Sequence, residues 1–173
     1  MAFLRWAVVT VPFILLLGFT SARSVPVGSE NRWYQALIKP DATPPDWVFP
    51  IAWTTLYVLL GLALAMIIHA RGSKARAPAL WLFAVQMVPN LLWTPLFFGA
   101  HQVLWSLVTI GIMFATTLAA TMLFARIRRA AAILMLPYLG WICFAGYLNY
   151  QIHVLNPNAA TLVPSSVSTQ IIS

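Results

Sequence analysis

The chain has 173 residues, of which 61% are hydrophobic and 8% are charged, and its formal net charge at pH 7 is +7. Ordinary soluble domains are roughly 45–50% apolar and about 25% charged, so a soluble globular domain is excluded. A basic chain would otherwise suggest a nucleic-acid partner, but most basic residues here lie in two short loops between apolar runs. The composition therefore predicts an integral membrane protein with no nucleic-acid partner.

Five apolar runs, taken in chain order, are each close to the roughly 20 residues that a helix needs to cross about 30 Å of hydrocarbon. They cover residues 3–22, 47–68, 78–98, 102–125 and 130–153. A membrane β-barrel would instead show segments of about ten residues with polar positions at every second step, and these runs are apolar on all sides. We therefore predict an all-α membrane protein, a five-transmembrane-helix bundle formed by one domain over residues 1–155.

The first run has two interpretations. Arg5, the apolar stretch 6–19 and the small residues 20–22 also match a cleavable signal peptide. We favour a retained helix because the other four spans are closely spaced and a fifth helix would pack against them.

The longest connection, residues 23–46, is predicted to be an ordered lid. Helical spacing of the apolar residues between 33 and 38 favours a short interfacial helix that ends before Pro40. Asp46 is expected to cap the second span, because its carboxylate would accept hydrogen bonds from the first free N–H groups of that helix.

The third predicted span carries amides and a proline where plain apolar residues would insert at lower cost. Gln86, Asn90, Trp93 and Phe97 are separated by four, three and four residues, so they share one helix face. An amide that faces lipid has no hydrogen-bond partner. This face is therefore expected to line an internal cavity, and Pro89 is expected to kink the helix beside it.

Two other spans present aromatic and amide side chains at the same helical spacing. In the second and fifth spans these are Trp53, Tyr57, Tyr138, Trp141, Ala145 and Asn149. The alternative interpretation is an interfacial belt of Trp and Tyr, with amides that only join helices. We prefer the belt for the tryptophans near span ends, which are Trp33, Trp47 and Trp105.

The distribution of charge predicts an orientation. With five spans, the loops after the second and fourth spans fall on the same side as Arg5, and that side has seven basic residues and no acidic ones. The positive-inside rule then places the N-terminus in the cytoplasm and the C-terminus outside. The basic side is expected to face anionic lipid. The tail, residues 156–173, is rich in Ser, Thr, Pro and Asn and is predicted to be disordered.

The sequence lacks the residues that several functional classes require. Spans two to five contain no Asp, Glu, Lys or Arg, so an ion-coupled pump is disfavoured. No pattern of nucleophile and base, metal-ligand spacing or phosphate loop occurs, so neither a metal site nor a conventional catalytic residue is predicted. Cys143 is the only cysteine, which excludes a disulfide within one chain.

At these residues the sequence resembles the translocator protein family, the TspO/MBR or tryptophan-rich sensory proteins, also called peripheral benzodiazepine receptors. The matching strings follow the family's order and spacing and cover most of residues 33–149. They are WYQALIKPDATPPDWVFPIAWTTLY, QMVPNLLWTPLFFG and PYLGWICFAGYLN.

The resemblance implies a five-helix bundle, often a homodimer, whose cavity opens towards the first loop. It also implies that this cavity binds porphyrins, haem-like tetrapyrroles and synthetic isoquinoline or benzodiazepine ligands, with no required cofactor. The positions that match the family pocket are Trp53, Tyr57, Asn90, Trp93, Phe97, Trp141 and Ala145, and helical spacing adds Tyr138 and Asn149.

The family is described as a porphyrin sensor, a transporter or a light-dependent degrader of porphyrin. Our first hypothesis is a membrane receptor for tetrapyrroles. One alternative is an enzyme that degrades porphyrin in light, with Trp53 and Trp141 at the reacting ligand, and another is a passive conduit or scaffold. A bacterial cell membrane is the favoured location, and the bacterial and mitochondrial outer membranes are the alternatives.

Two departures from the family limit what the resemblance implies. Residues 41–43 are Asp, Ala and Thr where the family often has aromatic residues, so a stacking role for the loop is not predicted. The sterol-recognition pattern needs a Lys or Arg within five residues after Tyr150, and none is present. Sterol binding through that pattern is not predicted.

Overall fold

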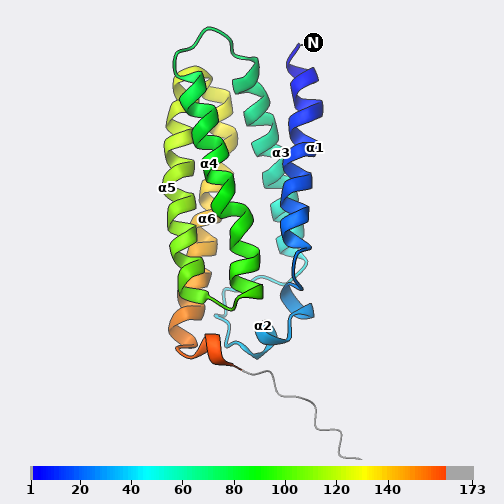
Figure 1. Cartoon of the computed structure of the whole chain (residues 1–173), viewed down its shortest axis with the longest axis vertical. Coiled ribbons are helices and arrows are strands. Elements are labelled where there is room, and N and C mark those ends of the chain that lie inside the picture. Colours follow the sequence, from blue (N-terminus) through cyan, green and yellow to red (C-terminus); the bar gives the residue numbers. More distant parts are fainter. Residues whose placement is uncertain (1, 163–173) are drawn as a thin grey trace, which may run out of the picture.

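The computed structural model describes residues 2–162 and contains five long helices in an elongated bundle (Figure 1). All five are long and apolar enough to cross a membrane. They are α1 (Ala2–Ala22), α3 (Val48–His69), α4 (Arg76–Thr94), α5 (Val103–Ile127) and α6 (Arg129–Leu155). The predicted all-α five-helix bundle is confirmed, and the predicted spans agree with these helices to within a few residues when the π-helical turn η2 (Pro95–Gly99) is counted with α4.

The short connection between α4 and α5 makes these helices antiparallel neighbours. The turn η2 follows α4 directly, and the Ala100 N–H donates to the Pro95 carbonyl at 2.9 Å. His101 then has a φ of 57°, a left-handed conformation that reverses the chain direction within a few residues. α5 therefore begins at Val103 and packs along α4.

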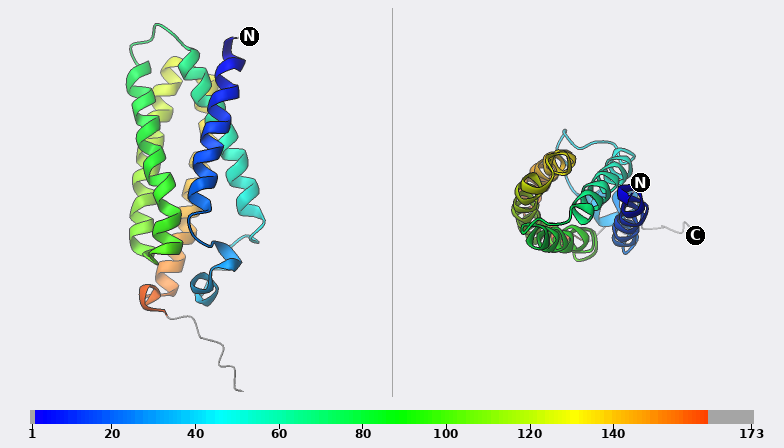
Figure 2. Two further views of the ribbon diagram at one scale, coloured as in Figure 1. Left: turned by 45° about the vertical axis from the view of Figure 1, so that its right-hand side comes forward. Right: turned by 90° about the horizontal axis from the view of Figure 1, so that it is seen from above.

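The helices follow one another around the bundle in the order α1, α3, α6, α5 and α4 (Figure 2). α1 packs along α3, α3 along α6, α6 along α5, and α5 along α4. By contrast, α3 and α4 share few contacts although they are consecutive in the chain, and so do α1 and α4. α1 and α3 are therefore less tightly packed against α4 than the other neighbouring helices are against one another.

α1 is an integral part of the bundle because it makes close contact with α3. The Thr10 Oγ1 donates a hydrogen bond to the Gly61 carbonyl at 2.7 Å. A Cβ atom added to Gly61 would lie 2.6 Å from the Cα of Val11, so glycine is needed for the two backbones to approach.

The lid (residues 23–46) is ordered, and it contains the 3₁₀ turn η1 (Gly28–Glu30) and the helix α2 (Arg32–Ala36). Asn31 caps α2 because its Oδ1 accepts the Tyr34 N–H at 3.0 Å. A short helix is thus present in the predicted region, but it ends at Ala36, earlier than the proline boundary indicated, and its interfacial position stays a prediction.

Two sequence interpretations of this region are wrong. Trp33 is 2% exposed, stacks on His101 at 4.4 Å and donates its Nε1–H to the Ala159 carbonyl at 2.7 Å, so it is a core residue and not part of an interfacial belt. Asp46 does not cap the second span: α3 begins at Val48, and the Asp46 Oδ2 instead accepts the Ser29 N–H at 2.8 Å. Trp47 and Trp105 are exposed, as the belt interpretation expects.

The predicted disorder of the tail is wrong for residues 156–162. The Asn156 side chain bonds both backbone polar groups of Ile38, accepting its N–H and donating to its carbonyl, each at 2.8 Å. The 3₁₀ turn η3 (Ala159–Thr161) follows and packs against Trp33. Residues 163–173 lie outside the described part of the chain.

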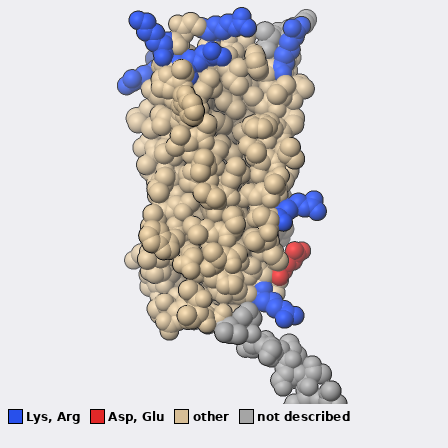
Figure 3. All heavy atoms as spheres, viewed as in Figure 1, with Lys and Arg blue, Asp and Glu red and all other residues tan. Residues whose placement is uncertain are grey.

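The two ends of the bundle differ in charge. Lys and Arg side chains gather at the end of the molecule that holds the N-terminus and the α3–α4 loop, while the long apolar surface between the ends is nearly free of them on the face shown in Figure 3. Such a surface is stable in the hydrocarbon of a membrane, because its side chains are apolar and the backbone N–H and C=O groups form hydrogen bonds within each helix. The structure thus supports a multi-pass membrane protein.

Candidate functional site

A cavity of about 370 Å³ lies beneath the lid, between the lid-side parts of the long helices. Its lining is largely apolar and aromatic, as in most small-molecule sites. The predicted residues that line it are Trp53, Tyr57, Asn90, Trp93, Phe97, Trp141, Ala145 and Asn149. The fold thus brings together, from α3, α4, η2 and α6, every predicted ligand-binding residue except Tyr138. Their role in ligand binding stays a prediction.

The deep end of the cavity is formed by a buried hydrogen-bond network centred on Asn90. The Tyr57 hydroxyl donates to the Asn90 Oδ1 at 3.0 Å, and the Asn90 Nδ2 donates to the Tyr138 hydroxyl at 2.5 Å. Asn90 is 4% exposed, so these partners satisfy an amide that would otherwise be costly to bury. The network also fixes the orientation of the Tyr57 ring beside the cavity.

Tyr138 and Gln86 lie behind this network and do not line the cavity. Both are fully buried, and the Tyr138 hydroxyl donates to the Gln86 Oε1 at 3.2 Å. The expectation that Gln86 and Tyr138 face the cavity is therefore wrong, because Asn90 and the ring of Trp53 lie against Tyr138 on the cavity side. The Gln86 Nε2 has no hydrogen-bond partner among residues 2–162.

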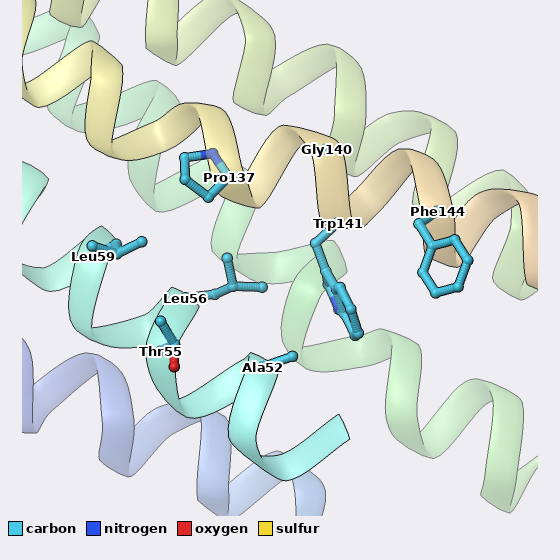
Figure 4. A pocket seen from close by; sticks show the side chains of 8 residues that line it. All are labelled: Ala52, Thr55, Leu56, Leu59, Pro137, Gly140, Trp141 and Phe144. Atoms are coloured by element: carbon cyan, nitrogen blue, oxygen red, sulfur yellow. The ribbon is translucent and has the colours of Figure 1, made fainter. Parts of the chain in front are cut away.

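Aromatic rings from two helices form one wall of the cavity. The indoles of Trp53 and Trp141 lie edge to face, with centroids 6.4 Å apart and planes at 86°, and Trp53 also packs on Tyr57 at 5.4 Å. Figure 4 shows the other side of this wall, where Trp141 extends from α6 towards α3 beside a shallower hollow that Ala52 and Gly140 also line. Trp141 therefore separates the cavity from the bundle surface.

The opposite wall is held by a chain of polar contacts between three helices. Trp93 stacks on Phe97 at 5.0 Å and donates its Nε1–H to the Asn149 Oδ1 at 3.3 Å. Asn149 in turn donates to the Val103 carbonyl at 2.8 Å, so α4, α5 and α6 are joined at this level. Both ring planes are thus fixed before any ligand arrives, which lowers the entropy lost on binding.

α1 contributes lining residues that sequence reasoning missed. Gly18, Phe19 and Ala22 line the cavity, and a Cβ atom on Gly18 would lie 2.0 Å from a ring carbon of Tyr57. Glycine at this position therefore leaves the space that the Tyr57 ring occupies. No local signal marks these residues, because α1 is apolar on all sides.

We define the mouth of the cavity as the part lined by residues 27–30, 43 and 46 of the lid. The resemblance implied an opening towards this loop, but it did not indicate these residues. Asp46 and Glu30 belong to the mouth, and Tyr34 lines the cavity as well. Burial, and next the charge of Asp46, raise the pKa of the Tyr34 phenol, so this hydroxyl stays neutral and able to donate. The mouth is thus the polar part of an otherwise apolar site.

The arrangement suits binding of a flat, mostly apolar molecule. Rings on two walls offer edge and face contacts, and the Tyr57–Asn90 pair offers one polar anchor at the deep end. Within residues 2–162, no three His, Cys, Asp or Glu side chains come together as metal ligands.

Comparison with known proteins agrees with this architecture. The TspO/MBR family matches residues 8–155. The chain is 38% identical over 144 residues to the tryptophan-rich protein TspO of Chlorobaculum tepidum, covering 83% of this chain and 90% of that protein. It is 36% identical over 149 residues to the tryptophan-rich sensory protein of Cereibacter sphaeroides (83% and 92% covered) and 37% identical over 150 residues to the human translocator protein (80% and 88% covered).

The family match spans all five long helices and the lid, and each of these relatives is covered over most of its length. The chain therefore belongs to the TspO/MBR family of membrane proteins.

Proposed function

We propose that this protein is an integral membrane receptor that binds porphyrins and related tetrapyrroles in the cavity beneath the lid, and that it senses these ligands or controls their passage. The observation that carries the proposal is the aromatic cavity itself, which is lined both by indoles from α3 and α6 and by a stacked Trp93–Phe97 pair from α4 and η2. A planar macrocycle offers two apolar faces to such walls.

The ligand lies, in this proposal, with its ring against Trp53 and Trp141 and a polar edge near Tyr57 and Asn90. Ring contacts add roughly 0.5–1.5 kcal/mol beyond the burial of area. Synthetic isoquinoline or benzodiazepine ligands would compete for the same apolar volume. Porphyrin or haem acts here as the ligand, and no cofactor is needed for binding.

The proposal also assigns an orientation. The basic end of the bundle faces the cytoplasm with the N-terminus, and the lid and residues 156–162 lie on the outer side. Ligand that enters through the mouth would then come from outside.

Quenching of tryptophan fluorescence by protoporphyrin in neutral detergent tests the binding site. Trp53→Phe and Trp141→Phe should each weaken the affinity about two- to tenfold, because each removes one indole from the wall. Trp81→Phe is the matched control, since Trp81 is exposed on α4 and 72% accessible. Unchanged affinity in both wall variants contradicts the proposed site.

A second candidate function is the light-dependent degradation of bound porphyrin, and the Trp53–Trp141 pair favours it. Both indoles line the cavity, so they would contact a porphyrin that absorbs light and reacts with dioxygen to give an oxygenated, ring-opened product. Illumination of the purified complex in air should yield this product at a lower rate in the Trp53→Phe/Trp141→Phe variant at saturating ligand. Equal rates in the variant, or no product, would remove this candidate.

The packed core counts against a passive conduit. Beyond the Tyr57–Asn90 network the bundle is filled by fully buried side chains, among them Leu60, Ile67 and Met135. A cavity that ends on such a core binds its ligand from one end, which agrees better with a receptor.

A further inference from the structure

The charged groups of the cavity are confined to its mouth and are all acidic. Glu30 and Asp46 belong to the lining, whereas none of the lining residues found within residues 2–162 is a Lys, Arg or His. The whole chain has three acidic residues and ten Lys and Arg residues. Composition alone would therefore not predict that the charged residues of the lining are acidic. The deep end, by contrast, offers only the neutral Tyr57 and Asn90 groups.

The Asp46 carboxylate is held in place. Its Oδ2 accepts the Ser29 N–H at 2.8 Å, which joins the end of the lid to the turn η1 that carries Glu30. Gly28, with a φ of 56°, allows this approach, since a Cβ atom there would lie 3.1 Å from the Asp46 Oδ2. The same charge acts on Tyr34 inside the cavity, where it contributes to the raised pKa of the phenol.

In the proposed binding mode, a ligand with its apolar ring inside the cavity places its outward end at the mouth, to which these two carboxylates belong. Two charges less than about 10 Å apart are only partly screened by salt, and protein between them lowers the effective dielectric constant. Their repulsion or attraction is then strong enough to change the affinity severalfold. A free carboxylate at this end would be repelled, whereas an ester or amide would not, and an ammonium group would be attracted.

We propose that Glu30 and Asp46 make the cavity selective for charge, so that it prefers flat apolar ligands whose outward end is cationic or uncharged over ligands that carry free carboxylates there. This inference rests on the proposed function. Among tetrapyrroles, it assigns higher affinity to porphyrins with esterified or amidated propionates than to the free diacids.

The test uses three probes that share one ring: protoporphyrin IX, its dimethyl ester, and its bis-amide with a short alkylammonium chain. Fluorescence quenching of the full chain in an uncharged detergent gives each affinity. The ratio of variant to wild-type affinity is compared for each probe, because partition into micelles cancels in that ratio. In Glu30→Gln/Asp46→Asn, the free acid should bind about three- to tenfold tighter, the ammonium probe weaker by a similar factor, and the ester equally well.

Two controls separate this effect from other causes. Asp46→Asn keeps a side-chain oxygen for the Ser29 N–H, and unchanged ester binding reports an intact cavity. Asp41→Asn removes the third acidic residue of the chain, which belongs to the same lid but is not among the lining residues, and it should leave all three affinities unchanged. Raising the salt to about 0.5 M should shrink the differences between probes.

The outcomes distinguish the two proposals. If none of the probes binds the wild-type protein, the proposed function fails. If all three bind but the double variant keeps the wild-type affinities, or if Asp41→Asn shifts them equally, charge selection by Glu30 and Asp46 is overturned while the proposed function stands.

Discussion

Asn90 shows how one residue joins the stability of the bundle to its candidate site. A buried amide needs partners for both its oxygen and its nitrogen, and here Tyr57 and Tyr138 from two other helices supply them. Because the hydrogen bonds lie in an apolar interior, they position the three side chains and are costly to break. The polar anchor proposed for the ligand is therefore also a structural contact between α3, α4 and α6.

Asn90→Ala should lower the free energy of unfolding by about 1–3 kcal/mol, because it leaves the buried Tyr57 hydroxyl without its acceptor. Thermal unfolding in detergent measures this. Thr116→Val serves as the control, since the Thr116 hydroxyl bonds only within its own helix, to the Ile112 and Met113 carbonyls. Equal melting temperatures for the two variants would show that the network does not stabilise the bundle.

The lid is the element on which access to the cavity depends, and its position is fixed by a segment far away in sequence. Asn156, just after α6, bonds the backbone of Ile38, while Trp33 bonds the carbonyl of Ala159. The stacking of Trp33 on His101 adds a third contact, to the α4–α5 turn. The lid is therefore held in place by contacts with residues at the ends of α4 and α6.

Asn156→Ala should loosen the lid, because three side-chain hydrogen bonds, two to Ile38 and one to Ile152, are lost together. Limited trypsin digestion should cut after Arg32 severalfold faster than in the wild type, whereas the Lys39–Pro40 bond resists trypsin in both. The control is Asn158→Ala, which changes an exposed residue close to Asn156 in the chain. Trypsin should cut this variant at the wild-type rate. The same rate in both variants would contradict the role of Asn156.

At the scale of the whole molecule, the separation of basic residues to one end is the feature from which we propose an orientation in the membrane. Five spans place the two termini on opposite sides of a membrane, and the basic end contains the N-terminus. The positive-inside rule then predicts that the basic end lies in the cytoplasm. In this proposed orientation, the candidate cavity opens on the side away from the cytoplasm.

A reporter enzyme that is active only outside the cytoplasm should be active when fused to the C-terminus. The same reporter inserted at Gly72, in the exposed loop between α3 and α4, should be inactive. The reverse pattern of activity would refute the orientation with the N-terminus inside.

The sequence by itself determined the number of spans and the aromatic and amide part of the cavity lining on α3, α4 and α6. Helical periodicity fixes which side chains share a face, so spacing placed Asn90 with Trp93 and Trp141 with Ala145. It also determined that one end of the bundle is basic, because five spans place Arg5 and both basic loops on the same side.

Only the tertiary structure decided how deep each residue lies and what it touches. Periodicity gives the direction of a side chain but not the distance between helices, so Tyr138 and Gln86 were assigned to a cavity that they do not reach. The Gly18–Tyr57 contact, the Asp46–Ser29 bond and the pairing of Asn156 with Ile38 join segments that are distant or irregular in the chain. Such contacts arise when the helices pack, because their geometry depends on where several elements meet and not on any local pattern.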